Sequence, residues 1–234
     1  MNKYFLMFLA VLLLGCKKNE TYQVYYRGSL RAIMMGEDLE AKMEMDSIAG
    51  LKNLYALGAM ENLKGEMLVL NSIPLISTVS DSTVTVERTF NKKPALLVYV
   101  QVTRWDTIKI TQPLRDTGEL ESLIASMIET RRLTQPVPFI LRGNFESLEW
   151  HVIRPKNRKI QNEHDGHKNT GFKGVLKNEN DVYVLGFFST EHQGIITHHD
   201  AFTHMHFKTP DDKLAGHVDN IILKGEVNLL LPGI

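Results

Sequence analysis

This sequence has very little cysteine and no excess of positive or negative charge. Cys16 is the one cysteine among 234 residues, so the chain cannot form a disulfide within itself, and its stability must come from its core or a bound metal. Lysine and arginine number 27, as do aspartate and glutamate. Without a positive field the chain does not attract phosphate backbones, and we expect no nucleic-acid partner.

The first 16 residues are typical of an export signal. Lys3 precedes an almost unbroken apolar run to Gly15, which is too short to cross a bilayer as a mature helix. The run ends in "LLGC", which resembles a bacterial lipoprotein signal, in which the cysteine is lipidated and becomes the first residue. We therefore expect residues 1–16 to be a lipoprotein signal peptide and Cys16 to be lipidated. The alternative is an incidental cysteine beside an uncleaved anchor.

Residues 17–234 predict one compact unit, because no repeat, low-complexity tract or long linker divides them. Good helix formers between Gly28 and Ile48 predict one or two short helices. Asp116 and Glu119 fit a capping box, and an apolar stripe predicts the helix that follows. The stripe consists of Leu120, Leu123, Ile124, Met127 and Ile128.

The strands are predicted from alternating or continuous apolar runs. In the first half they lie at residues 65–77, with a turn at Asn71-Ser72, then at 82–90 and 95–105. In the second half they lie at 139–153, 172–178, 182–189, 203–208 and 217–231. The predicted fold class is α+β, with a mixed α/β first half and an antiparallel β second half.

Three histidines form the clearest candidate site. His204 and His206 stand two apart in a predicted strand, so their side chains share a face, and a turn near Pro210 brings His217 beside them. Three imidazoles on one face suit a divalent transition metal, most simply one zinc ion with an open, catalytic position. The alternative is that His204 faces solvent while the other two make ordinary hydrogen bonds.

The segment "HMHFKTPDDKLAGHVD" resembles the metal segment of the α-acetolactate decarboxylases, with the same spacing of histidines. "YVLGFFSTEHQGI", "ENLKGEMLVLNSIP" and "PFILRGNFESL" resemble other stretches of that family, in the same order along nearly all of residues 17–234.

The resemblance implies an enzyme, a carbon–carbon lyase that converts 2-acetolactate to acetoin. In that family the histidines hold zinc, a hydroxy-keto acid chelates the metal, and the metal stabilises the enediolate left by carbon dioxide. Glu66 matches a family glutamate that handles a proton near the metal. Without the resemblance, Glu66 would read as a solvent-facing strand residue. The resemblance also allows a homodimer.

Two parts of the family pattern are altered. Where the family has an arginine that steers the substrate carboxylate, the ungapped position is His151, and Arg154 stands nearby. We expect His151 to fill part of the arginine's role, and Arg142 to make a surface ion pair. The family continues into a tail that supplies a second glutamate, and no residue here takes that role by position.

Four loop histidines could also approach the metal or the substrate, although each is more simply read as solvated: His164, His167, His198 and His199. The first hypothesis is an exported, lipid-anchored acetolactate decarboxylase at the bacterial cell envelope, whose only membrane contact is its lipid. The alternatives are an exported metal-binding lipoprotein of the same fold that acts on another hydroxy or keto acid, or one without catalytic activity.

Overall fold

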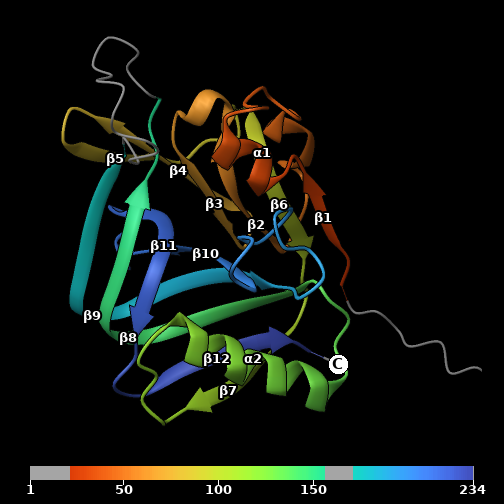
Figure 1. Cartoon of the computed structure of the whole chain (residues 1–234), viewed down its shortest axis with the longest axis vertical. Helices are drawn as coiled ribbons and strands as arrows, with labels where there is room; N and C mark the ends of the chain where they lie inside the picture. The colour runs from red at the N-terminus through yellow and green to blue at the C-terminus, as the bar shows by residue number, and fades with distance from the viewer. Residues whose placement is uncertain (1–21, 156–170, 234) are drawn as a thin grey trace, which may run out of the picture.

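Two antiparallel sheets make up most of the structure (Figure 1). A computed structural model of the chain describes residues 22–155 and 171–233. Strands account for 51% of the structure and helices for 14%. The predicted α+β class with a mixed α/β first half is therefore wrong, and the fold is mainly β. Within the described ranges, no helix is both long and apolar enough to span a membrane.

The stretch between Gly28 and Ile48 agrees with the one or two short helices predicted for it. It forms a short helix, α1 (Leu30–Met35), and one turn of 3-10 helix, η1 (Met45–Ile48). Gly36 ends α1 in the left-handed conformation, with φ of 69°, which glycine adopts without a steric penalty. The error in the fold class lies in the strands: Val24–Arg27 and Leu54–Met60, which the sequence did not predict, are strands of a sheet whose pairings are all antiparallel.

The first sheet has six strands in the order β1-β6-β2-β3-β4-β5. Their bounds are β1 (Val24–Arg27), β2 (Leu54–Met60), β3 (Glu66–Leu70), β4 (Ile73–Ser80), β5 (Thr83–Glu87) and β6 (Pro94–Gln101). A 3-10 turn, η2 (Glu61–Leu63), joins β2 to β3. Asn71 and Ser72 have φ of 48° and 65° and close the β3–β4 hairpin, which confirms the predicted turn.

The second sheet has the order β11-β10-β9-β8-β12-β7. Its strands are β7 (Trp105–Ile110), β8 (Val137–Val152), β9 (Phe172–Phe188), β10 (Thr203–Lys208), β11 (Ala215–Ile222) and β12 (Val227–Pro232). Strand β9 is continuous where the sequence predicted two strands. Strand β11 pairs with both β10 and β8, so β8, β9, β10 and β11 close on themselves and bring distant histidines into adjacent strands.

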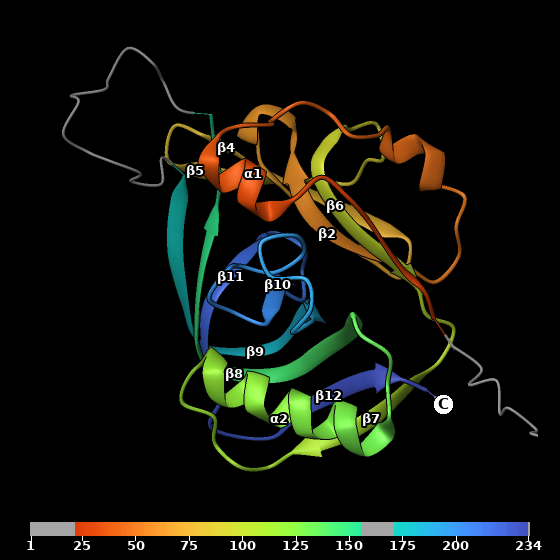
Figure 2. The same ribbon diagram turned by 45° about the vertical axis from the view of Figure 1, so that its right-hand side comes forward.

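The longest helix among the described residues, α2 (Thr117–Arg131), covers the second sheet (Figure 2). The Asp116 carboxylate accepts a hydrogen bond from the Glu119 backbone N–H at 2.9 Å, which confirms the predicted helix start. The Glu119 carboxylate accepts the Arg115 backbone N–H at 2.8 Å and so does not complete a box with Asp116. The apolar face of α2 packs into the core of the second sheet through three buried side chains: Leu120, Ile124 and Ile128.

The two sheets face each other across a shared core, to which Leu57 and Leu68 of the first sheet and Phe187 of the second belong. Ser77 Oγ of β4 donates a buried hydrogen bond of 2.7 Å to the Ala215 carbonyl oxygen of β11. These contacts hold the strand that carries Glu66 against the strands that carry the histidines.

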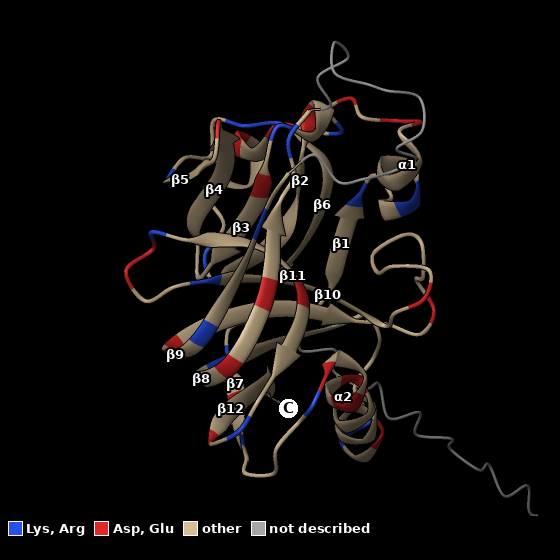
Figure 3. Ribbon diagram, turned by 60° about the vertical axis from the view of Figure 1, so that its left-hand side comes forward, with Lys and Arg blue, Asp and Glu red and all other residues tan. Residues whose placement is uncertain are grey.

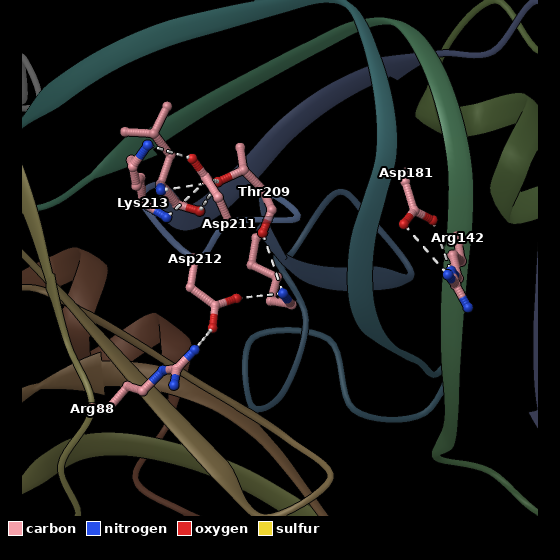
Figure 4. A network of polar contacts seen from close by, with 9 residues as sticks. Arg88, Arg142, Asp181, Thr209, Asp211, Asp212 and Lys213 are labelled. Carbon is pink, nitrogen blue, oxygen red and sulfur yellow. Dashed lines mark hydrogen bonds and ion pairs between the residues drawn. The ribbon is translucent and has the colours of Figure 1, made fainter.

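Ion pairs reinforce the edge of this contact (Figure 4). Arg88, which follows β5, pairs with Asp212 in the turn between β10 and β11, and Lys208 pairs with the same carboxylate. Arg142 pairs with Asp181 at 2.8 Å between half-exposed side chains, which confirms the ion pair expected of Arg142.

Acidic and basic residues are interspersed over strands and loops (Figure 3).

Candidate metal centre and active site

The closed strands β8, β10 and β11 place three histidines in one row. His206 of β10 lies directly opposite His217 of β11, and His217 lies opposite His151 of β8. His204 precedes His206 by two residues and shares its face of the strand. The turn at residues 209–214 sends the chain back in the register that makes His206 and His217 neighbours. The structure therefore brings the three predicted ligands together and adds His151 to them.

The three predicted ligands are buried, with exposed fractions of 3% for His204, 0% for His206 and 8% for His217. The alternative in which His204 faces solvent is therefore wrong. The ring centroid of His204 lies 5.1 Å from that of His206 and 5.2 Å from that of His217, and the other two are 5.5 Å apart. Three imidazoles on a tetrahedral metal, with bonds of about 2 Å, have centroids about 5 Å apart. The ring separations therefore match those of imidazoles around one metal.

The ring nitrogens support the same interpretation. His204 Nδ1–H donates to the Ile196 carbonyl oxygen at 2.9 Å, which leaves Nε2 with its lone pair for a ligand. Among the described residues, the ring nitrogens of His206 and of His217 are buried and make no hydrogen bond of good geometry, although His217 Nδ1 lies 3.4 Å from Asp219 Oδ1. A buried nitrogen without a partner carries an unfavourable desolvation energy. Coordination of a metal would remove that energy.

The described residues whose ligand atoms converge are an overlapping group, which shares only His217 with the predicted set. His151, His217 and Asp219 each offer one ligand atom within 4.8 Å of the others. However, Asp219 Oδ1 is 2.7 Å from His151 Nδ1 and 3.4 Å from His217 Nδ1. The Asp219 carboxylate is therefore already engaged with His151, and it orients the two imidazoles beside it. Sequence reasoning missed Asp219, although it stands two residues after His217 in the same strand.

Glu66, the first residue of β3, reaches the cluster from the first sheet. Its side chain is buried, so the solvent-facing alternative is wrong. Glu66 Oε2 lies 3.7 Å from His206 Nε2, and Oε1 lies 4.0 Å from His151 Nε2. Burial raises the pKa of Glu66 to about 7, although the charge of His151 opposes the rise. A carboxyl group with that pKa can exchange a proton near neutral pH.

His151 lies between two acids. Burial lowers the pKa of His151, but the hydrogen bond to Asp219 and the charge of Glu66 outweigh burial, so the net shift is upward. Burial raises the pKa of Asp219, but its hydrogen bonds to His151 and His217 hold that pKa below the usual range. The line Asp219–His151–Glu66 therefore favours a protonated imidazole beside the histidine cluster.

The loop histidines have different placements. His198 is half-buried, and its ring centroid is 5.5 Å from that of His217 and 6.4 Å from that of His204. His198 therefore lies beside the histidine cluster. His199, next to it, has a side chain that is 74% exposed. His164, His167 and Cys16 lie outside the described residues.

Two cavities meet at the cluster. The first has a volume of about 420 Å³ and is lined by Glu66, His151, His204 and His217, by Arg154, and by apolar side chains of α1. The second, of about 390 Å³, lies beside the start of α2. Both are lined by His198 and His217. A small molecule in the first cavity would contact the histidines, the buried acid and a guanidinium group.

Comparisons with known proteins agree with this fold. The family model for alpha-acetolactate decarboxylase matches residues 24–230. A structure of that enzyme from Bacillus subtilis strain 168 has 16% identity and a TM-score of 0.68, over 91% of this chain and 86% of the other. A Staphylococcus aureus protein of unknown function, described as similar to alpha-acetolactate decarboxylase, has 14% identity and a TM-score of 0.66 over 89% and 84%. No curated protein matches the chain by sequence.

The fold and the family match define an enzyme of the carboxy-lyase class. The chain belongs to the alpha-acetolactate decarboxylase family. The sequence resemblance to that family is thereby confirmed.

The buried histidines should make the metal-free protein sensitive to acid. Burial lowers the pKa of His217 to about 4 and holds those of His204 and His206 well below 6.5. Because these groups are neutral when folded and protonate near pH 6.5 when unfolded, each contributes stability above pH 6.5 that is lost as the pH falls toward the folded value. We expect the free energy of unfolding to fall by roughly 1 kcal/mol per pH unit for each such histidine.

Urea unfolding of chelator-treated protein at pH 7 and pH 5 measures this loss. The His217→Gln variant should lose less stability between the two values than the parent chain, and the exposed His199→Gln variant should lose the same amount as the parent. An equal loss in all three proteins would show that His217 is not held neutral by burial.

Proposed function

We propose that this protein decarboxylates 2-acetolactate to acetoin with one zinc ion per chain. The observation that carries the proposal is the buried cluster of three histidines, two of which have buried ring nitrogens without a hydrogen bond of good geometry, beside a cavity that is also lined by a buried acid. The family match supplies the reaction class. A hydroxy-keto acid of this size fits the cavity, since ligand sites typically have volumes of about 300–1,000 Å³.

His204, His206 and His217 would hold the metal, and three neutral imidazoles leave an open position, as in catalytic zinc sites. When bound, the ion supplies a Lewis acid for the negative charge that develops on the substrate's hydroxyl and keto oxygens, the enediolate. His204 is oriented for this task by the Ile196 carbonyl, and His217 by Asp219.

Glu66 would deliver the proton that the carbon needs after carbon dioxide leaves. Its carboxyl group lines the same cavity as the histidines. A general acid works best when its pKa is near the working pH, and burial raises that of Glu66 to about 7.

His151 would fill part of the role of the family's arginine. Protonated and held by Asp219 at 2.7 Å, it would place a cation beside the substrate carboxylate. Arg154 lines the same cavity and offers a second cation. Asp219 would take over part of the role of the family's second glutamate, because it orients His151 and His217.

The leading experiment measures acetoin formed from racemic 2-acetolactate by residues 17–234, which include every described helix and strand, with and without zinc. Zinc-dependent production above the spontaneous background is expected. The His204→Ala variant should lose both the metal and the activity, whereas His199→Ala should keep both. A folded, zinc-loaded protein that produces no acetoin would exclude this substrate, and an unchanged zinc content in His204→Ala would exclude the metal site.

The Glu66→Gln variant separates the proton donor from the metal. The amide has the same shape but cannot give up an acidic proton, so we expect a full zinc content with kcat lowered by about 10²- to 10⁴-fold. The matched control is Glu87→Gln, because Glu87 is an exposed glutamate of the same sheet and should change neither quantity. Full activity in Glu66→Gln would remove this residue from the mechanism.

Export and anchoring remain part of the proposal on the basis of the sequence alone. We propose that residues 1–16 are a signal peptide and that lipid on Cys16 holds the protein at the cell envelope. In a bacterial host fed with labelled palmitate, the full chain should incorporate label and sediment with membranes, and Cys16→Ser should do neither. Label retained by Cys16→Ser would contradict lipidation at this residue.

A further inference from the structure

The first cavity is divided into a polar end and an apolar end. The polar end is formed by Glu66, Arg154 and the histidines. The apolar end is formed by seven side chains from α1, η2, β6 and the residue after β8: Leu30, Ile33, Met34, Met35, Leu63, Leu96 and Ile153. A substrate that puts its hydroxyl, keto and carboxylate oxygens at the polar end therefore directs its carbon substituents toward an apolar surface.

The apolar end, called the apolar wall below, has a fixed position, because α1 is held on two sides. Leu30 and Ile33 are buried in a small core with Ala59 and Leu96 of the first sheet. The Leu30 backbone N–H donates to the Ile195 carbonyl oxygen at 2.9 Å, so α1 is also bound to the loop that precedes His204. The helix thereby spans from the first sheet to the histidine side of the cavity.

The wall is larger than acetolactate needs. That acid has about nine non-hydrogen atoms and offers two methyl groups for apolar contact, whereas a cavity of about 420 Å³ has room for many more atoms, since one water needs about 10–15 Å³. Met34 and Met35 remain 47% and 59% exposed, although they lie at the apolar end. Methionine side chains are flexible and adapt to apolar partners of different shape.

We propose that the site takes 2-hydroxy-3-oxo acids whose alkyl substituents are longer than methyl, with acetolactate as the smallest member of the series. The substituent lies along α1, against Met34 and Leu63, while the oxygens of the acid remain at the histidines. This inference rests on the proposed function for the identity of the polar end, and on the apolar lining for the length of the substituent.

The test compares binding and turnover along two series. Binding of unreactive 2-hydroxy acids, from 2-hydroxypropanoate to 2-hydroxyoctanoate, is measured by calorimetry on zinc-loaded residues 17–234. Affinity should rise up to about fourfold per methylene, the gain for a fully buried CH₂. In parallel, kcat/KM is measured for acetolactate and for homologues with ethyl, propyl and butyl groups at C2, and it should rise along this series.

Met34→Ser tests the wall at a side chain that is already half-exposed, so the variant is expected to fold. It should weaken binding of 2-hydroxyoctanoate several-fold more than that of 2-hydroxypropanoate. Ile73→Ser is the matched control, because Ile73 is equally exposed on β4, outside the cavity, and should leave both affinities unchanged. Affinity that does not depend on chain length, or equal effects of both substitutions, would overturn the inference.

The two series also separate this inference from the proposed function. If acetolactate is decarboxylated and chain length has no effect on binding or kcat/KM, the inference fails and the proposed function stands. If long 2-hydroxy acids bind through Met34 and no 2-hydroxy-3-oxo acid is decarboxylated, the apolar site stands and the proposed function fails.

Discussion

The burial of imidazole nitrogens without partners is the constraint on which the rest of this structure depends. His206 and His217 are opposite each other across two strands, and the ring nitrogens of both are buried without a hydrogen bond of good geometry. Polar groups are rarely left in this state, because their desolvation is not offset. A bound metal offsets it, so the same interaction would stabilise the strands and create the reactive centre. Part of the folding free energy would then depend on the ion.

The closure of β8, β9, β10 and β11 supplies the rigid frame for this centre. Because β11 pairs with β10 on one side and β8 on the other, a change of its register would break two ladders of hydrogen bonds. The position of His217 is therefore fixed. The buried acid comes from the other sheet, and the sheets are joined by a shared core and by the bond between Ser77 and Ala215. Groups held by packed sheets keep their geometry better than groups on loops.

Local patterns were enough to predict part of this arrangement. The spacing of His204, His206 and His217 predicted one face and one turn, and the apolar stripe after Asp116 predicted α2. The fold class was wrong because no strand was predicted at β1 or β2, so the six-stranded first sheet was not recognised. The pairing of β11 with β8 has no local signal, since it joins residues far apart in the chain. The contact of Asp219 with His151 therefore could not be predicted from the sequence.

The division of the centre between two sheets has a consequence for how the protein tolerates change. The proposed metal ligands belong to the second sheet alone, whereas Glu66 reaches His206 from the first sheet across 3.7 Å. Substitutions that slide one sheet on the other would alter the position of the acid while the histidines keep their spacing. Misplacement by about 1 Å can lower a rate by about 10²-fold. A genetic selection for metal uptake and one for turnover would therefore recover different sets of residues from the same molecule.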